Sequence, residues 1–255
     1  MMRKLFLSVV IVLLVLIVVA VIVAGFFLGT IVKTGMETVG PKITQVSIKV
    51  DAVNLSLLTG SAGVKNLIVV NPEGYKTPQA ISAGSTAVDV NPLTVWSDKI
   101  VVRSVRVEAA VITFEGGLGG NNLSKIMDNV NASAKSGGPA STNNTAKAGN
   151  EPGRKIEVDD FLITGAKVHV SLPDLGGEET TLPLPDIHLT NLGKGNAGIT
   201  ATDLTRRVLG AITTATIKVV ASATTDIGKG PGKAVGESMN KITPGIGGLF
   251  NKSTN

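Results

Sequence analysis

The chain opens with an unbroken apolar segment. Residues 5–28 contain no charged side chain, and only one serine and one glycine interrupt the aliphatic and aromatic residues. As a helix rising ~1.5 Å per residue, this segment would be roughly 36 Å long, enough to cross the ~30 Å hydrocarbon core of a bilayer. A secretory signal peptide, the alternative, has an apolar region of about 7 to 15 residues followed by small residues, but Ile22 and Val23 stand where small residues would be needed. The pattern therefore predicts a retained transmembrane anchor over residues 1–32.

Beyond residue 45 the apolar positions change from a helical period to a period of two. Residues 46–50 alternate apolar and polar side chains, and residues 53–57 repeat the pattern, which is typical of strands with one face in water. Further strands are predicted at residues 62–70, 79–90, 99–108 and 110–115. Their connections are short and rich in turn formers, so successive strands are expected to pair as antiparallel neighbours. The alternation slips phase within residues 99–108 and predicts a β-bulge near Arg103 and Ser104.

The second half of the chain contains one helix, a polar segment and more strands. Residues 121–130 follow a Gly-rich turn and indicate a short helix. Residues 131–153 are almost entirely Ala, Ser, Asn, Gly, Thr, Lys and Pro without an apolar period, so we expect a flexible linker. Residues 154–192 alternate again, with strands predicted at 155–163, 167–172 and 180–190. These strands are expected to complete the sheet of residues 33–130, the alternative being a separate hairpin domain.

Residues 193–255 are predicted to form a basic helical tail. Apolar residues at spacings of three and four indicate an amphipathic helix over residues 202–223, although its β-branched residues weaken a helix. A second, weaker amphipathic segment follows at residues 235–246. The tail holds 8 Lys and Arg against 3 Asp and Glu, whereas residues 1–192 hold 16 of each, so the net charge of +5 lies here. Such a tail can meet anionic lipid headgroups or can simply be a solvated helix face.

Charges flanking the apolar segment set its expected orientation. Arg3, Lys4 and the α-amine precede the segment, whereas the twenty residues after it carry only Lys33 and Lys42. The positive-inside rule then places the N-terminus in the cytoplasm and the bulk of the chain outside it. The absence of cysteine is compatible with an oxidising compartment. Because no Lys and Arg cluster is interleaved with aromatic residues, nucleic acid is not an expected partner.

No constellation in the sequence supports an enzyme. Without cysteine, a catalytic or metal site would need histidines and carboxylates, but His169 and His188 both fall on the polar phase of their predicted strands and lack the spacing of metal ligands. Asp159 and Asp160 would point to opposite faces of a strand, and a solvated turn is expected there. Trp96, the single tryptophan, is expected to anchor a corner of the sheet. The prediction is a non-enzymatic protein without catalytic residues, metal or cofactor.

Short motifs follow one another in a characteristic order along the chain. After the apolar segment and the first strands comes a Leu-x-Val-x-Asn-Pro-x-Gly-Tyr turn at residues 67–75, then a strand ending near Asn91 and Pro92, and later the Asn-Asn-Leu start of the helix at residues 121–123. This order resembles the N-terminal region of AsmA-family proteins over roughly residues 1–190. The resemblance implies an inner-membrane anchor, a periplasmic antiparallel sheet curled into an apolar groove, and a role in envelope lipid traffic or outer-membrane biogenesis.

The size of the chain limits what such a groove could do. About eight strands spaced ~4.8 Å apart make a sheet roughly 40 Å across, hardly more than one bilayer. A module of this width could shield an acyl chain or dock onto a longer envelope protein, but it could not bridge two membranes. The expected partners are therefore membrane lipid and an envelope protein.

We thus expect a mainly β protein with an N-terminal transmembrane helix, a curled, groove-like antiparallel sheet, a short helix after the first strands and C-terminal amphipathic helices. Candidate lipid-contact residues lie on the less polar faces of the predicted strands: Val46, Ile48, Val50, Leu67, Val69, Val88, Val90, Val105, Val107, Ile112 and Phe114. The alternative is a membrane-anchored β-sandwich resembling the WHy-type domains of late-embryogenesis-abundant proteins, with a structural or protein-interaction role. In that fold the same residues would form a closed core.

Overall fold

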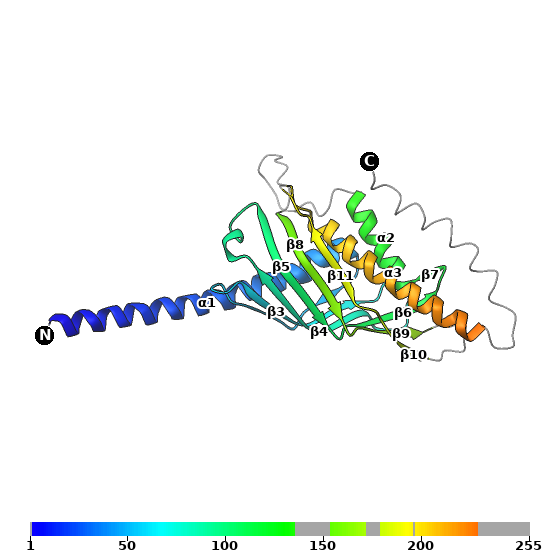
Figure 1. The fold of residues 1–255 in the computed structure, drawn as a ribbon, viewed down its shortest axis with the longest axis horizontal. Helices are drawn as coiled ribbons and strands as arrows, with labels where there is room; N and C mark the ends of the chain where they lie inside the picture. The colour runs from blue at the N-terminus through cyan, green and yellow to red at the C-terminus, as the bar shows by residue number, and fades with distance from the viewer. Residues whose placement is uncertain (1, 136–153, 172–178, 196, 229–255) are drawn as a thin grey trace.

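The computed structural model describes residues 2–135, 154–171, 179–195 and 197–228 (Figure 1). A long N-terminal helix leads into a sheet, a second helix interrupts the strands, and a third helix ends the described chain. The elements in chain order are α1 (Met2–Thr44), β1 (Ile48–Lys49), β2 (Ala52–Leu55), β3 (Ser61–Val70), β4 (Gln79–Val90), the 3-10 turn η1 (Pro92–Thr94), β5 (Lys99–Glu108), β6 (Val111–Gly117), β7 (Gly120–Asn121), α2 (Asn122–Lys135), β8 (Lys155–Thr164), β9 (Lys167–Ser171), β10 (Glu179–Pro183), β11 (Ile187–Leu192) and α3 (Ala201–Gly228).

Within the described residues, eleven strands form one mixed sheet. Its main path runs β10-β9-β6-β4-β5-β8-β11; β3 pairs with β4 on that strand's other edge, and β1 and β2 pair with β3. The expectation of a wholly antiparallel sheet is wrong, because β5 pairs with β8 and β6 with β9 in parallel. The strands after the polar segment therefore belong to the same sheet as those before it.

The parallel pairs arise because β5 and β6 do not form a hairpin. After β5, Ala109 and Ala110 carry the chain onward in the same direction, so that β5 lies beside the second part of β4 and β6 beside its first part. The strands β8 and β9 also follow one another in the same direction, and they lie beside β5 and β6. A single register runs along both pairs, from Lys99 opposite Lys155 to Glu115 opposite Ser171. Short connections thus join collinear strands here as well as antiparallel neighbours.

The sheet bends where each of these strand pairs is joined. Ala109 has a φ of 51° and Gly165, at the same place in the next strand, has a φ of 61°. This left-handed conformation is uncommon outside glycine, and the ladder continues through it, because Ala109 N donates to Thr164 O at 2.9 Å. The bend divides the sheet into a near half, on the side of the free part of α1, and a far half. The near half holds β2, β5, β8, β11 and the second part of β4, and the far half holds β1, β6, β9, β10 and the first part of β4. Figure 1 shows β5, β8 and β11 on one side of the bend and β6, β9 and β10 on the other.

The predicted β-bulge is confirmed in β5. Asp89 lies opposite Ser104 and Val90 opposite Val102, so Arg103 is the extra residue on the bulged strand. The Arg103 guanidinium pairs with the Asp89 carboxylate at 2.7 Å. The bulge restores the alternation, so Val102 and Val105 both face the same side of the sheet.

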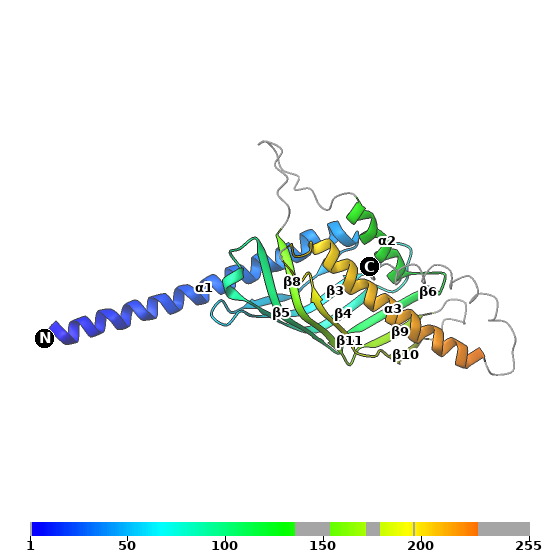
Figure 2. The ribbon, with the colours of Figure 1, turned by 45° about the horizontal axis from the view of Figure 1, so that its top comes forward.

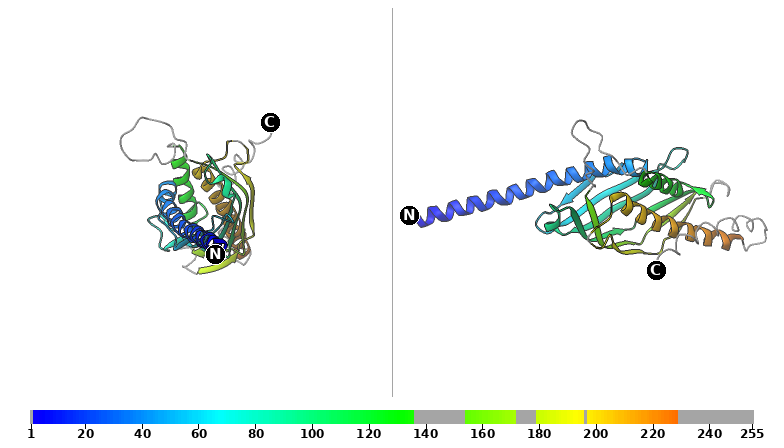
Figure 3. Two further views of the ribbon diagram at one scale, coloured as in Figure 1. Left: turned by 90° about the vertical axis from the view of Figure 1, so that its left-hand side faces the viewer. Right: turned by 90° about the horizontal axis from the view of Figure 1, so that it is seen from above.

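The inner face of the curled sheet packs against α1, α2 and α3 (Figures 2 and 3). Fully burying a Leu, Ile or Phe side chain stabilises the fold by roughly 1.5–3 kcal/mol, and most of this burial lies in the far half. Its core contains Ile112, Phe114, Val168 and Val170 from the sheet, Leu123, Ile126 and Val130 from α2, and Leu209, Ile212 and Val220 from α3. The layer opposite the sheet is helical, so in the described residues the chain does not form the two-sheet sandwich of the alternative interpretation.

Helix α1 is continuous from the predicted anchor into the domain. Its first part extends away from the sheet (Figures 1 and 3). From Gly29 onward the helix lies against β2 and β1. A Cβ at Gly29 would stand 2.2 Å from the carbonyl oxygen of Val53, so the two backbones touch at this position. The Glu37 carboxylate then accepts a hydrogen bond from Val50 N at 3.0 Å.

Among the described residues, no helix has a stretch both long enough and apolar enough to cross a membrane. The side chains of residues 2–10, 17–18 and 20–26 lie outside the described set. The anchor at residues 1–32 therefore stays a prediction.

Several element bounds differ from expectation. Residues 131–135 belong to α2, so the predicted linker begins too early, and its remainder, 136–153, lies outside the described residues. The single strand expected at 180–190 is two strands, β10 and β11, because Pro185 stands between them.

The tail helix is confirmed as α3, whose apolar face is buried despite its β-branched residues. The second tail segment, at 235–246, lies outside the described residues.

Candidate lipid-contact surface

The predicted lipid-contact residues separate into two groups. Seven of them are covered: Val46, Ile112 and Phe114 lie in the core, Leu67, Val69 and Val107 pack against it, and Val50 is buried outside it. The others are half-buried and lie outside that core: Ile48, Val88, Val90 and Val105. The structure therefore removes the first group from any lipid-contact surface and brings part of the second group together.

Three of the half-buried residues meet on β4 and β5. Val88 lies opposite Val105, and Val90 lies opposite Val102. Val105 is on the inner face, because Val107, two residues further along the same strand, packs against the core. Val88, Val90, Val102 and Val105 thus form a continuous apolar strip on the inner face of the near half, which we call the valine strip. Ile48 lies apart, with its Cδ1 against Gly40 of α1.

Val102 belongs to the strip but was not among the candidates. The signal that could have found it is the phase slip itself, because a bulge at Arg103 places Val102 on the same face as Val105. Its neighbour in β8, Val158, is buried. Since α1 covers β1 and β2 while α3 covers β8 and β11, the strip lies between the two covered regions.

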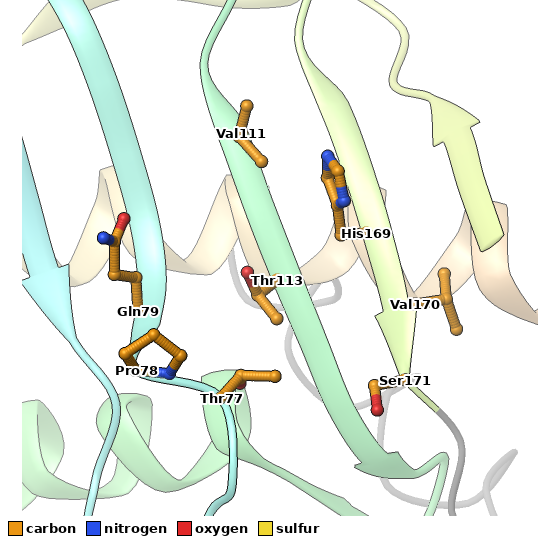
Figure 4. A pocket seen from close by; sticks show the side chains of 8 residues that line it. All are labelled: Thr77, Pro78, Gln79, Val111, Thr113, His169, Val170 and Ser171. Carbon is orange, nitrogen blue, oxygen red and sulfur yellow. The ribbon is translucent and has the colours of Figure 1, made fainter. Parts of the chain in front are cut away.

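A shallow hollow lies on the opposite, outer face of the far half, with α3 behind the strands (Figure 4). Its volume of about 190 Å³ is below the ≈ 300–1,000 Å³ of typical small-molecule sites. Its lining is a mixture of apolar and uncharged polar groups around the exposed His169: Thr77, Pro78, Gln79, Val111, Thr113, Val170 and Ser171. Among the described residues, no group of three His, Asp or Glu side chains is placed to hold a metal ion.

A charged cluster joins three strands on the outer face of the near half. Asp160 accepts a hydrogen bond from Nε2 of His188 at 2.5 Å and forms an ion pair with Arg106. The hydrogen bond from His188, with the bond and charge of Arg106, lowers the pKa of Asp160 despite its desolvation. Asp160 lies inside β8 rather than in the solvated turn that we expected. The cluster links β5, β8 and β11 through an ion pair and a charge-assisted hydrogen bond.

A buried polar network joins the two motifs that carry the family resemblance. The Asn122 side chain at the start of α2 donates to Asn71 Oδ1 in the Asn-Pro turn and to Thr113 O, both at 2.7 Å, and its Oδ1 accepts from Glu115 N at 3.0 Å. The Glu115 carboxylate accepts bonds from Thr77 N at 2.8 Å and from the Thr77 hydroxyl at 2.5 Å. These bonds fix the turn after β3 to the end of β6, so the motifs position the sheet.

Trp96 does not anchor a sheet corner. It lies just after η1, in the β4–β5 connection, and 81% of its surface is exposed. The prediction failed because aromatic identity indicates a preference for partial burial but does not say which surface provides it.

Comparison with protein-family models, with curated proteins and with solved structures finds no match to this chain. The function is therefore inferred from the sequence pattern and the geometry of the chain itself.

Proposed function

We propose that this chain is a non-enzymatic, membrane-anchored envelope protein whose sheet contacts lipid acyl chains through the valine strip. The observation that carries the proposal is the strip itself: four valines on two paired strands, half-buried and outside the core that the helices cover. An apolar surface left uncovered in this way is expected where a ligand, a lipid or a partner completes it.

The chemistry of α1 supports a bilayer as the source of that lipid. Six consecutive apolar residues of this helix, residues 11–16, are each 54–61% exposed. Six consecutive helical positions occupy every face, and a helix that is apolar all round is typical of a protein core or a membrane span. We infer that residues 5–28 anchor the chain, with the N-terminus in the cytoplasm and the domain in the periplasm.

The resemblance to the AsmA family supports the same class of function. The residues that carry it form the Asn71–Asn122 network, which holds the curled sheet together at its far half. A role in envelope lipid traffic, with membrane lipid and a longer envelope protein as partners, follows as part of the proposal. The small width of the sheet favours shielding of acyl chains over transport between two membranes.

Photo-crosslinking of the full chain in lipid vesicles tests the proposal. A benzophenone amino acid is placed at Val88 or at Val105, and at Ala87 as the matched control, because Ala87 is exposed on the same strand and points to the opposite face. Mass spectrometry is expected to find phospholipid adducts at the two valine positions and not at Ala87. Equal labelling at all three positions, or none at the valines in a vesicle-bound chain, would contradict acyl-chain contact.

A further inference from the structure

Three apolar side chains protrude from one end of the sheet. Leu93 is 87% exposed, Trp96 81% and Leu58 79%, and these are the most exposed large apolar side chains among the described residues. Leu58 lies in the β2–β3 loop, and Leu93 and Trp96 lie in the β4–β5 connection. Together they form what we call the loop patch.

The two loops are held next to each other. Val90 N donates to Gly60 O at 2.8 Å, and a Cβ at Gly60, whose φ is 77°, would stand 2.0 Å from the Val90 carbonyl oxygen. The glycine is therefore required for this close approach. The Arg103 guanidinium also reaches across to Thr59 O at 3.4 Å. Leu58 on one loop is thereby fixed close to the start of the other.

The second loop is itself held in a defined conformation. The Asn91 side chain accepts a hydrogen bond from Leu93 N at 3.2 Å and caps the 3-10 turn, and Asn91 N donates to Val101 O at 2.8 Å. The Arg154 guanidinium donates to Val95 O at 2.7 Å. Leu93 and Trp96 are thus presented outward by a hydrogen-bonded turn, and a cation lies one residue from the indole.

The loop patch lies at the end of the domain from which α1 departs. Gly29, the residue at which α1 meets the sheet, touches Val53 in β2, and the Leu58 loop begins where β2 ends. In the views of Figures 1 and 3, the β4–β5 connection points toward the same side as the free part of α1. The apolar segment of α1 ends at residue 28, immediately before this contact. A membrane that contains that segment would therefore face the loop patch.

We propose that Leu58, Leu93 and Trp96 insert into the interfacial layer of the same bilayer that holds α1, which gives the domain a second membrane contact. This inference rests on the proposed anchor. Tryptophan prefers the boundary between hydrocarbon and headgroups, where its apolar ring and its polar N–H are both accommodated, and a cation such as Arg154 is attracted to anionic headgroups there. Val90 directly precedes this loop, so the valine strip would begin at the membrane surface and receive acyl chains from it.

Trp96 provides the test, because it is the only tryptophan in the chain. The full chain is reconstituted in phosphatidylcholine and phosphatidylglycerol vesicles, with or without bromine on the upper part of the acyl chains. Bromolipid is expected to quench the Trp96 emission at least twofold, and the double variant Leu58→Asp, Leu93→Asp is expected to lose most of that quenching. The matched control is Trp96→Phe with His169→Trp, which moves the fluorophore to the exposed outer face of the far half and should show no quenching.

A separate measurement distinguishes failure of this inference from failure of the anchor. Retention of the chain in the vesicle pellet after an alkaline wash reports on α1 alone. If the chain is retained while bromolipid leaves Trp96 unquenched, the loop patch does not touch the bilayer, and the anchor stands. If the wash releases the chain, the anchor is contradicted, and with it this inference, which requires that α1 and the loop patch share one bilayer.

Discussion

The side-chain amide of Asn122 donates a 2.7 Å hydrogen bond to Oδ1 of Asn71, a residue 51 positions earlier in the chain. Asn122 is fully buried, and its other bonds go to Thr113 O and Glu115 N. One amide at the start of α2 thus satisfies polar groups on a turn and on β6. Sequence order alone could not show that the two asparagine motifs meet.

Replacement of this amide is expected to be costly. Asn122→Ala leaves three buried polar groups without their partner, and each such group costs about 1–3 kcal/mol. We expect the free energy of unfolding to fall by about 3 kcal/mol or more, measured by urea denaturation of the full chain in detergent micelles. Asn54→Ala is the control, because Asn54 is exposed on β2 and its loss should change stability by less than about 0.5 kcal/mol. Similar effects of the two substitutions would show that the network is not stabilising.

Glu115 should make stability depend on pH. Burial alone would raise the pKa of this carboxyl, but hydrogen bonds from Lys76 N and from the Thr77 hydroxyl and N, with the charge of Lys76, outweigh burial and lower it. A carboxyl whose pKa is lower in the folded state than in the unfolded state stabilises the fold above the unfolded pKa. That contribution is lost as the pH falls through the folded pKa.

The variant Glu115→Gln should therefore be less stable than the parent chain at pH 7, and the difference should shrink as the pH is lowered below the ordinary carboxyl range. Urea denaturation at a series of pH values measures this difference. Glu108→Gln, at an exposed position on β5, serves as the control and should give a small, flat difference. A difference for Glu115→Gln that is constant with pH would mean that the carboxylate charge does not contribute.

The positions of the strands along the chain could be predicted from the sequence better than the strands with which they pair. The bounds of β4 and β5 agree with the alternation to the residue, because alternation is a local property that follows from the pleat. The parallel pairing of Lys99 with Lys155 joins segments separated by a helix and a polar segment, and no local period encodes it. The left-handed Ala109 was equally hidden, since alanine gives no indication of a positive φ.

The candidate surface shows the same limit. The alternation correctly placed Val88, Val105, Ile112 and Phe114 on apolar faces of their strands. It could not show that helices cover Ile112 and Phe114. Whether a strand residue is covered depends on where α2 and α3 pack against the sheet, and that packing is a tertiary property. The valine strip is therefore what remains of the predicted groove once the positions of the helices are known.

The contact between α1 and β2 depends on the absence of a side chain at Gly29. Because a Cβ there would stand 2.2 Å from Val53 O, Gly29→Ala should push the helix from the strand and lower stability by about 1–3 kcal/mol. Gly35, in the same helix, has nothing within 4 Å of the corresponding position, so Gly35→Ala should raise stability by about 0.5–1 kcal/mol through helix propensity. Urea denaturation of both variants provides the comparison, and a stabilising Gly29→Ala would contradict the close packing of α1 on β2.

The neighbouring positions Val105 and Val107 separate lipid contact from core packing. Both face inward on β5, but Val107 packs against the core and Val105 belongs to the valine strip. An unpaired carboxylate in the core costs several kcal/mol, so Val107→Asp should unfold the domain. Val105→Asp should leave it folded, with thermal unfolding close to that of Ala87→Asp, a control on the outer face of the paired strand.

The variants Ala87→Asp and Val105→Asp should be similarly stable but should differ in lipid binding. The lipid adduct formed by a crosslinker at Val88 should persist in Ala87→Asp and disappear in Val105→Asp, because Val105 lies directly opposite Val88. The loss of adduct in a folded variant would locate acyl-chain contact on the strip. Unfolding of Val105→Asp as severe as that of Val107→Asp would instead show that the strip is part of a closed core, and an undiminished adduct in folded Val105→Asp would show that lipid does not lie against it.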